Sequence, residues 1–366
     1  MMRNRNLAMS LMTMPTMNAI VMQDGEVSLQ QVDLPKPQAG QVLVRSLACG
    51  ICGSDIHITR HYNEVFDFYR QLGVMPEGVD KHAAVMLGHE FCAEIVEFGP
   101  QTQQALALGT RVTSVPILMS QNGAGVGVTP GVNGAYSEYF ILDEALLMPV
   151  PEHLPSEAVA LTEPLAVGLH AVNRGDVQAE DVALVVGCGP IGLAVISALH
   201  LRGVAKIVAA DLQSDKLQLA REFGATHTVN PSEQDEVAFA AKLAAGQRLV
   251  IFECVGIHKL IEGFVQRAPA KATIVVTGIH TANSNINYAY ATVKELDMCF
   301  SYYYQPAEFA ACLEELAQGT IPWRKLLTGK VGMDGVSGAF KQLMKPNPHI
   351  KVVIEPWRNG ELEMLD

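Results

Sequence analysis

The sequence lacks the features that would place this chain in a membrane or on a nucleic acid. No apolar run reaches the roughly 20 residues that a membrane-spanning helix needs. Basic residues are few: 26 Lys and Arg stand against 38 Asp and Glu, which gives a net charge of −12 at pH 7. Phosphate backbones and anionic lipids require basic patches. We therefore expect no nucleic acid and no membrane among the main partners.

The chain also lacks the cysteine pattern of a secreted, disulfide-bonded protein. Its seven cysteines are an odd number at irregular spacings, which favours reduced thiols in the cytoplasm, some of them available to a metal. Residues 1–16 hold five methionines but neither the apolar segment nor the small-residue cleavage site of a secretory signal. We expect them to form a disordered leader, with ordered structure from Met17.

What the sequence does contain is organised around one stretch, residues 182–211. Residues 182–187 are mostly β-branched or apolar and predict a buried parallel strand. A glycine-rich turn follows, then an apolar helix that starts near Pro190 and stops at Gly203, then a second strand over 206–210. This strand–helix–strand unit predicts an α/β fold with a doubly wound parallel sheet.

The glycine-rich turn reads G-x-G-x-x-G, which is typical of dinucleotide binding when a strand and a helix flank it. Gly187 permits a tight turn, Gly189 lets backbone N–H groups approach a pyrophosphate, and Gly192 lets the helix pack close to the strand. Pro190 and Ile191 complete the expected cofactor contact. A purely structural turn is the alternative interpretation, and the order of strand, glycines, helix, strand and acid argues against it.

The acid in that order is Asp211, nineteen residues after Gly192. A carboxylate there can hold the hydroxyls of the adenosine ribose and repel a 2′-phosphate, and residues 212–214 offer no arginine for such a phosphate. The sequence therefore predicts NAD rather than NADP. Lys216 is a further candidate for the same ribose, with a solvated helix lysine as the alternative.

The pattern changes near residue 160, which predicts two domains. Strands with turn-rich connections dominate 17–159, whereas strands and helices alternate over 160–303 and supply six strands. The last part, 304–366, contains a helix and a strand that we expect to fold back onto the first part. We thus expect a mostly β domain of 17–159 with 304–366, and a dinucleotide-binding Rossmann domain of 160–303.

Three side chains outside the dinucleotide unit suit a metal site: Cys52, His89 and Glu163. One thiolate, one imidazole and one carboxylate fit a tetrahedral zinc whose fourth position stays open to water or substrate. Each alone has a structural alternative, because a single Cys is usually a small core residue, a single His a satisfied polar group, and a Glu before Pro a helix start. Their joint occurrence beside a dinucleotide fold favours the metal.

These motifs together resemble those of the zinc-dependent medium-chain dehydrogenases, the alcohol and polyol dehydrogenase superfamily. The resemblance runs from about Met17 to the C-terminus. It rests on CGICGSDIH (49–57), GHE (88–90), the pair Glu163-Pro164, GCGPIG (187–192) and Asp211. It implies a GroES-like catalytic domain beside the Rossmann domain, and hydride transfer between NAD(H) and a secondary alcohol or polyol. A glutamate rather than a second cysteine at position 163 points to the sorbitol, butanediol and threonine dehydrogenase branch.

The resemblance implies a metal role for five residues. Cys52, His89 and Glu163 become the zinc ligands, and Glu90 sits behind the metal, where it can replace a ligand transiently. Asp55 holds the ligand histidine, as carboxylates often do in zinc sites. Many relatives carry a cluster of four cysteines for a second, structural zinc, but this chain has no cysteine between positions 92 and 188. We therefore expect one zinc per chain.

Two further residues of the first motif match a proton relay. Ser54 corresponds to the hydroxyl beside the substrate oxygen, and His57 to the residue that passes the proton toward solvent. Their structural alternatives are a turn hydroxyl and a surface histidine. The resemblance also implies a homodimer or homotetramer that pairs through the last strand of the cofactor sheet, expected over 298–303.

Two other functions stay open at this point. One is a zinc-free, NADPH-dependent reductase of the same fold, and the other is a cofactor-binding protein without catalysis. The intact set of metal ligands argues against both, and Asp211 argues against the first.

The segment 58–87 is longer than the resemblance leads us to expect, and both of its ends lie beside predicted metal-site residues. On a helix, Tyr62, Phe66 and Tyr69 would share one face. That face either lines the substrate cleft, which would favour an aryl or longer alkyl secondary alcohol, or packs a surface helix onto the β core.

Overall fold

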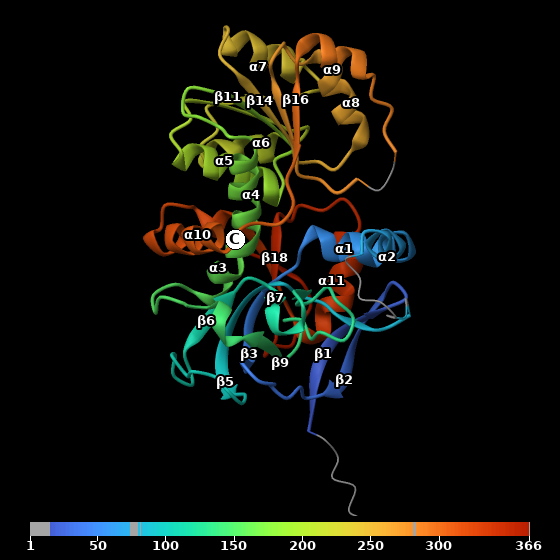
Figure 1. Cartoon of the computed structure of the whole chain (residues 1–366), viewed down its shortest axis with the longest axis vertical. Helices are drawn as coiled ribbons and strands as arrows, with labels where there is room; N and C mark the ends of the chain where they lie inside the picture. Colours follow the sequence, from blue (N-terminus) through green and yellow to red (C-terminus); the bar gives the residue numbers. More distant parts are fainter. Residues whose placement is uncertain (1–14, 74–79, 81, 281–282, 366) are drawn as a thin grey trace, which may run out of the picture.

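A computed structural model describes residues 15–73, 80, 82–280 and 283–365. The expected leader lies outside the described residues except for its last two positions, and Thr16 already belongs to strand β1 (Thr16–Gln23). Figure 1 shows a parallel sheet with its helices at one end of the molecule and a mostly antiparallel sheet at the other, with α4 and α10 between them. Among the described helices, none is long and apolar enough to cross a membrane.

The parallel sheet has six strands in the order β13-β12-β11-β14-β15-β16. Their bounds are Val182–Val186 for β11, Lys206–Ala210 for β12, His227–Val229 for β13, Leu249–Glu253 for β14, Thr273–Val276 for β15 and Asp297–Phe300 for β16. The helices of this part are α4 (Thr162–Arg174), α5 (Pro190–Leu201), α6 (Ser214–Glu222), α7 (Glu236–Ala244), α8 (His258–Arg267) and α9 (Tyr288–Lys294). The order is that of a dinucleotide-binding sheet, which confirms the predicted fold class.

The central strand forms where the sequence predicts it, because every residue of β11 is buried and apolar. Helix α5 begins at Pro190, whose fixed backbone angle suits a first turn, and Gly203 follows its end with a φ of 82°. The strand expected over 298–303 is shorter than predicted. It ends at Phe300, and Tyr303 takes the left-handed backbone region with a φ of 65°.

The other end of the molecule is built from β strands of the first and last parts of the chain. The large sheet has the order β10-β6-β5-β3-β18-β17-β19, with β9 also paired to β3. Its strands are β3 (Gln41–Gly50), β5 (Glu90–Phe98), β6 (Arg111–Ser114), β9 (Tyr139–Asp143), β10 (Leu147–Pro149), β17 (Leu327–Gly332), β18 (Lys351–Glu355) and β19 (Glu363–Met364). The strand expected near the C-terminus does fold back, since β18 pairs with β3.

Two small sheets and five helices complete this end. Strand β1 pairs with β2 (Glu26–Asp33) and β4 (Val85–Met86), while β7 (Ile117–Leu118) pairs with β8 (Ala124–Gly125). The helices are α1 (Gly53–Arg60), α2 (Tyr62–Gln71), α3 (Ser156–Ala160), α10 (Pro306–Gln318) and α11 (Val336–Leu343). Helices α1 and α2 include the first described part of the long segment 58–87.

Candidate active site

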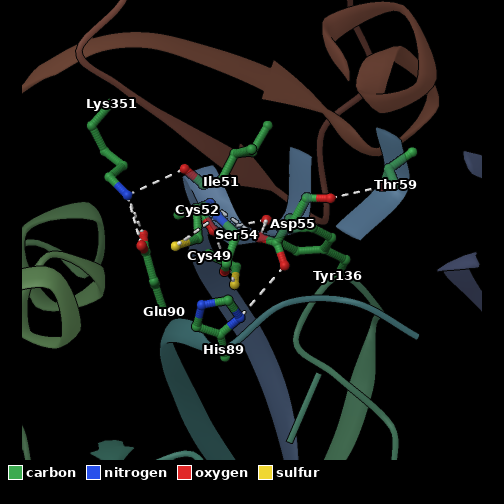
Figure 2. A network of polar contacts seen from close by, with 11 residues as sticks. Cys49, Ile51, Cys52, Ser54, Asp55, Thr59, His89, Glu90, Tyr136 and Lys351 are labelled. Atoms are coloured by element: carbon green, nitrogen blue, oxygen red, sulfur yellow. Dashed lines mark hydrogen bonds and ion pairs between the residues drawn. The ribbon is translucent and has the colours of Figure 1, made fainter. Parts of the chain in front are cut away.

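The donor atoms of Cys52, His89 and Glu90 all lie within 4.8 Å of one another. Cys52 follows the end of β3, and His89 and Glu90 stand at the start of β5, the neighbouring strand. Figure 2 shows the three side chains converging from these two strand ends. The antiparallel pairing of β3 and β5 is thus what brings positions 52 and 89 together across a separation of thirty-seven residues.

Cys52 is held in place as the N-cap of helix α1. Its sulfur accepts the Ser54 backbone N–H at 3.5 Å, and its own N–H donates to Asp55 Oδ2 at 3.0 Å. This reciprocal arrangement satisfies donors that a helix start leaves open. The two contacts fix the position of the Cys52 sulfur at the site.

His89 faces a fully buried carboxylate, as predicted for Asp55. His89 Nδ1 lies 3.5 Å from Asp55 Oδ1, and Tyr136 donates its hydroxyl to Asp55 Oδ2 at 2.7 Å (Figure 2). Burial raises the pKa of Asp55, against the opposing effects of His89 and Tyr136. Burial by itself would lower the pKa of His89, but Asp55 and Cys52 outweigh it and raise that pKa. Sequence reasoning missed Tyr136, for which no motif gives a signal.

Glu90 makes a buried ion pair with Lys351 that the sequence analysis also missed. Lys351 Nζ lies 2.6 Å and 2.8 Å from the two carboxylate oxygens of Glu90 and 3.2 Å from the carbonyl oxygen of Ile51 (Figure 2). The two side chains are 0% and 3% exposed. The sequence offers one indication of this buried charge: a single lysine begins the otherwise apolar run of strand β18.

Glu163 lies close to this group but is not one of its three converging donors. It stands in the first turn of α4 and is buried. Burial raises the pKa of Glu163 to about 7, with Glu90 adding to the rise and His89 and Lys351 opposing it. Glu90 has both oxygens engaged by Lys351, whereas Glu163 has no salt-bridge partner among the described residues. A cation at the site would therefore compensate the negative charge of Glu163 in particular.

Two tyrosines after β16 extend the site, and sequence reasoning did not single them out. The rings of Tyr303 and Tyr304 stack with centroids 4.6 Å apart. Both hydroxyls are buried: that of Tyr304 lies close to the Glu163 carboxylate and that of Tyr303 close to the Tyr304 hydroxyl, although neither contact has full hydrogen-bond geometry. Burial raises the pKa of both phenols, and the nearby charge of Glu163 adds to the effect. Buried hydroxyls without well-formed hydrogen bonds are costly, so these two indicate a place where a ligand can supply such bonds.

Ser54 and His57 lie on α1, next to Cys52. The Nε2 atom of His57 is buried without a partner, and its ring lies 4.9 Å from that of His61. Burial lowers the pKa of His57, as does His61, while Glu64 opposes them. Among the described contacts, none joins the Ser54 hydroxyl to His57 directly. A relay between them needs a substrate or water in between.

The glycine-rich turn has the shape that a pyrophosphate requires. Gly187 has a φ of 95°, and a side chain on Gly192 would collide with the Gly187 carbonyl oxygen. A Cβ on Gly189 would meet nothing within 4 Å, so this backbone faces open space at the start of α5. Pro190 and Ile191 form the first turn of that helix. These features fit a dinucleotide.

Asp211 ties the end of β12 to the glycine-rich turn. Its carboxylate accepts N–H groups from Cys188 at 2.8 Å and Gln213 at 3.0 Å. Lys216 lies near enough to affect Cys188, since burial and Asp211 raise the pKa of that thiol and Lys216 lowers it. The structure therefore brings Asp211 and Lys216 to the same edge as the glycines, where the sequence analysis expects the ribose.

Family comparisons agree with this geometry. A family model described as "Alcohol dehydrogenase GroES-like domain" matches residues 38–152, and one described as "Zinc-binding dehydrogenase" matches residues 190–318. The (R,R)-butanediol dehydrogenase of Bacillus subtilis is 32% identical over 350 residues, covering 90% of this chain and 97% of that protein. The chain belongs to the zinc-binding medium-chain dehydrogenases, which confirms the resemblance, and it is an oxidoreductase of the alcohol dehydrogenase type.

Individual relatives show the range within this family. Sorbitol dehydrogenase 1 of Saccharomyces cerevisiae is 27% identical over 342 residues, covering 86% of this chain and 91% of the relative. The crystal structure of the Bacillus subtilis 2R,3R-butanediol dehydrogenase has a TM-score of 0.78 at 30% identity, covering 93% of this chain and 99% of that one. A putative zinc-binding dehydrogenase from Sinorhizobium meliloti 1021, solved bound to NADP, has a TM-score of 0.78 at 26% identity, covering 93% and 100%.

Proposed function

We propose that the chain is a zinc-dependent dehydrogenase that transfers hydride between NAD(H) and a secondary alcohol group of a diol or polyol. The observation that carries this proposal is the buried donor set around Cys52 and His89, beside unpartnered polar atoms. The relatives named for butanediol and sorbitol support the substrate class. The glycine-rich turn and Asp211 support the cofactor.

We assign the zinc to Cys52, His89 and Glu163. The thiolate, imidazole and carboxylate are donors that zinc prefers, and Glu163 is the buried carboxylate without a cationic partner. When bound, zinc supplies a Lewis acid that lowers the pKa of an alcohol ligand. We propose one zinc per chain, because no cysteine lies between positions 92 and 188 to supply a second, structural site.

The remaining residues of the site orient these ligands and move the proton. Asp55, itself held by Tyr136, fixes the ring orientation of His89. Lys351 keeps the charge of Glu90 compensated beside the ligands. Ser54 accepts the proton of the substrate hydroxyl while its own hydroxyl proton passes to an intervening water or substrate hydroxyl. His57 accepts the proton from that group and releases it toward solvent, since its lowered pKa keeps the imidazole neutral.

For the cofactor we propose NAD. The carboxylate of Asp211 stands at the end of β12, where it would hold the ribose hydroxyls and repel a 2′-phosphate. NAD, when bound, accepts the hydride at its nicotinamide ring.

For the substrate, the structure favours a hydroxylated compound over an aryl alcohol. Tyr62 and Phe66 are 7% and 3% exposed and pack on the β core. Tyr69, the third residue of the α2 aromatic face, lies close to Cys52 and Tyr302 instead. The buried hydroxyls of Tyr303 and Tyr304 and the Nε2 atom of His57 can pair with additional substrate hydroxyls.

A substrate and cofactor panel tests the proposal. We expect zinc at about one per chain by elemental analysis, and a higher kcat/KM for 2,3-butanediol or sorbitol than for 1-phenylethanol, with NAD⁺ preferred over NADP⁺. Better turnover of 1-phenylethanol than of both polyols would contradict the substrate class. A metal-free protein with full activity would contradict the zinc-dependent reaction.

We also propose the domain division and assembly expected from the sequence: 17–159 with 304–366, a Rossmann domain of 160–303, and a homodimer or homotetramer paired through β16. Strand β16 is an edge of the parallel sheet, and Phe300 is 64% exposed there. A monomer by light scattering at micromolar concentration would reject the assembly.

We also propose a cytoplasmic location, which the seven free thiols support.

A further inference from the structure

A second buried carboxylate–histidine pair lies outside the metal site, and neither of its members has a role so far. Glu253 is the last residue of β14 and is wholly buried. His280, on the loop after β15, places its Nε2 atom 3.0 Å from Glu253 Oε2, with 13% of its side chain exposed. A buried carboxylate needs several hydrogen-bond donors. The other donors to Glu253 show which segments the pair holds together.

Those donors come from two loops. Glu253 Oε1 accepts the N–H groups of Val255 at 2.9 Å and Gly256 at 2.7 Å, both in the loop that follows β14. The Glu253 carbonyl accepts the hydroxyl of Thr277 at 2.6 Å, which begins the loop after β15. With His280, this one residue ties the two loops to each other at the carboxyl edge of the sheet.

The tied loops border the glycine-rich turn. A Cβ on Gly187 would lie 2.7 Å from Cγ2 of Val255. The glycine-rich turn and the loop after β14 are therefore in contact. Val255 is 45% exposed and Ile279, next to His280, is 42% exposed. Exposed apolar side chains at the carboxyl edge of a parallel sheet can pack against one face of a planar ring.

The strand order identifies that ring. In a sheet of the order 3-2-1-4-5-6, the dinucleotide lies across the switch point between the two halves. Asp211 and the strand β12 lie on one side of β11, so we expect the adenosine half of the dinucleotide on that side. Strands β14 and β15 lie on the other side, which leaves their loops to the nicotinamide half.

We propose that Glu253 and His280 are positioning residues that pre-form the nicotinamide subsite by holding residues 254–256, after β14, and residues 277–280, after β15, together. This inference rests on the proposed dinucleotide function. A loop that is already ordered loses less entropy on binding, so the pair raises affinity for the nicotinamide half of the cofactor without contributing to the adenosine half.

The test compares binding of NAD⁺ and of ADP-ribose, which lacks only the nicotinamide ring, by isothermal titration calorimetry. For His280→Ala we expect the Kd of NAD⁺ to rise about tenfold and that of ADP-ribose less than about twofold. His280→Gln, whose amide can still donate to Glu253, restores most of the NAD⁺ affinity. Steady-state rates should show a raised KM for NAD⁺ with kcat changed far less.

The matched control is His170→Ala, which removes a similar pair, His170 Nδ1 to Glu308 Oε2 at 2.9 Å, between α4 and α10. It should leave both affinities unchanged. Wild-type NAD⁺ binding by His280→Ala, or an equal loss for NAD⁺ and ADP-ribose, overturns the proposal. A wild-type protein that binds neither compound rejects the dinucleotide function itself, and this inference with it.

Discussion

The metal site and the cofactor edge are assembled in opposite ways. The proposed metal site draws Cys52, His89, Glu163 and Lys351 from four separate segments, and its buried charges lie against one another. The cofactor edge takes its glycines and Asp211 from one continuous stretch of thirty residues. Most of its contacts are made by backbone N–H groups, two of which donate to the Asp211 carboxylate. The first region depends on tertiary pairing, whereas the second depends on local chain geometry. Single substitutions should therefore cost more in the first.

The largest effect should follow removal of a metal donor. Cys52→Ala should lose zinc and lower kcat by roughly 10⁴-fold, about 5 kcal/mol, because the Lewis acid is lost. Cys49→Ala is the matched control: this cysteine is buried three residues earlier on the same strand end but is not among the converging donors. Elemental analysis and steady-state rates measure both. Full zinc retention in Cys52→Ala would show that the site does not depend on this ligand.

The next effect is on stability. Lys351→Met should destabilise the fold by about 4 kcal/mol, since it leaves the buried carboxylate of Glu90 without its partner. Adding Glu90→Gln to this variant should recover most of the loss. The exposed pair of Lys330 and Glu355, 3.8 Å apart, serves as the control, and Lys330→Met should cost less than about 1 kcal/mol. Denaturant unfolding measures all three, and equal losses for the two lysines would contradict the argument.

A smaller effect is expected at the cofactor edge. Asp211→Ser should lower the preference of kcat/KM for NAD⁺ over NADP⁺ by about 10- to 100-fold, because the 2′-phosphate no longer meets a negative charge. Asp215→Ser, in the exposed first turn of α6, is the control and should leave the preference unchanged. An unaltered preference in Asp211→Ser would place cofactor selection elsewhere.

The last prediction concerns pH and the metal-free protein. Because the folded-state pKa of Glu163 is about 7, above its usual 4.5, the metal-free fold holds a proton that the unfolded chain has already released. Stability of the metal-free protein should then fall as pH rises between about 4.5 and 7. Glu163→Gln should remove most of this fall in stability, which amounts to roughly 3 kcal/mol across that pH window, with zinc removed by chelation in both proteins. A slope that is unchanged in the variant would assign the titration to another group.

The contrast between the two regions also explains which residues sequence reasoning could find. Motif spacing points to Cys52, His89 and Asp55 as candidates, because short runs carry them. Tyr136, Lys351 and the tyrosines after β16 lie in segments with no motif, and only strand pairing brings them to the site. The aromatic face of α2 divides between two roles: Phe66 is buried in the core, whereas Tyr69 lies close to Cys52 and Tyr302.

Local sequence patterns are sufficient to predict the parallel sheet, the glycine-rich turn and the family. These follow from periodicity, glycine geometry and spacing within single strand–helix–strand units, where neighbours in the chain are neighbours in space. Only the tertiary structure decided which carboxylate Lys351 neutralises, which side chain anchors Asp55, and that Glu253 and His280 meet. These contacts join residues that are 27 to 261 positions apart. No local pattern encodes such pairs, because they arise from the packing of strands and loops against one another.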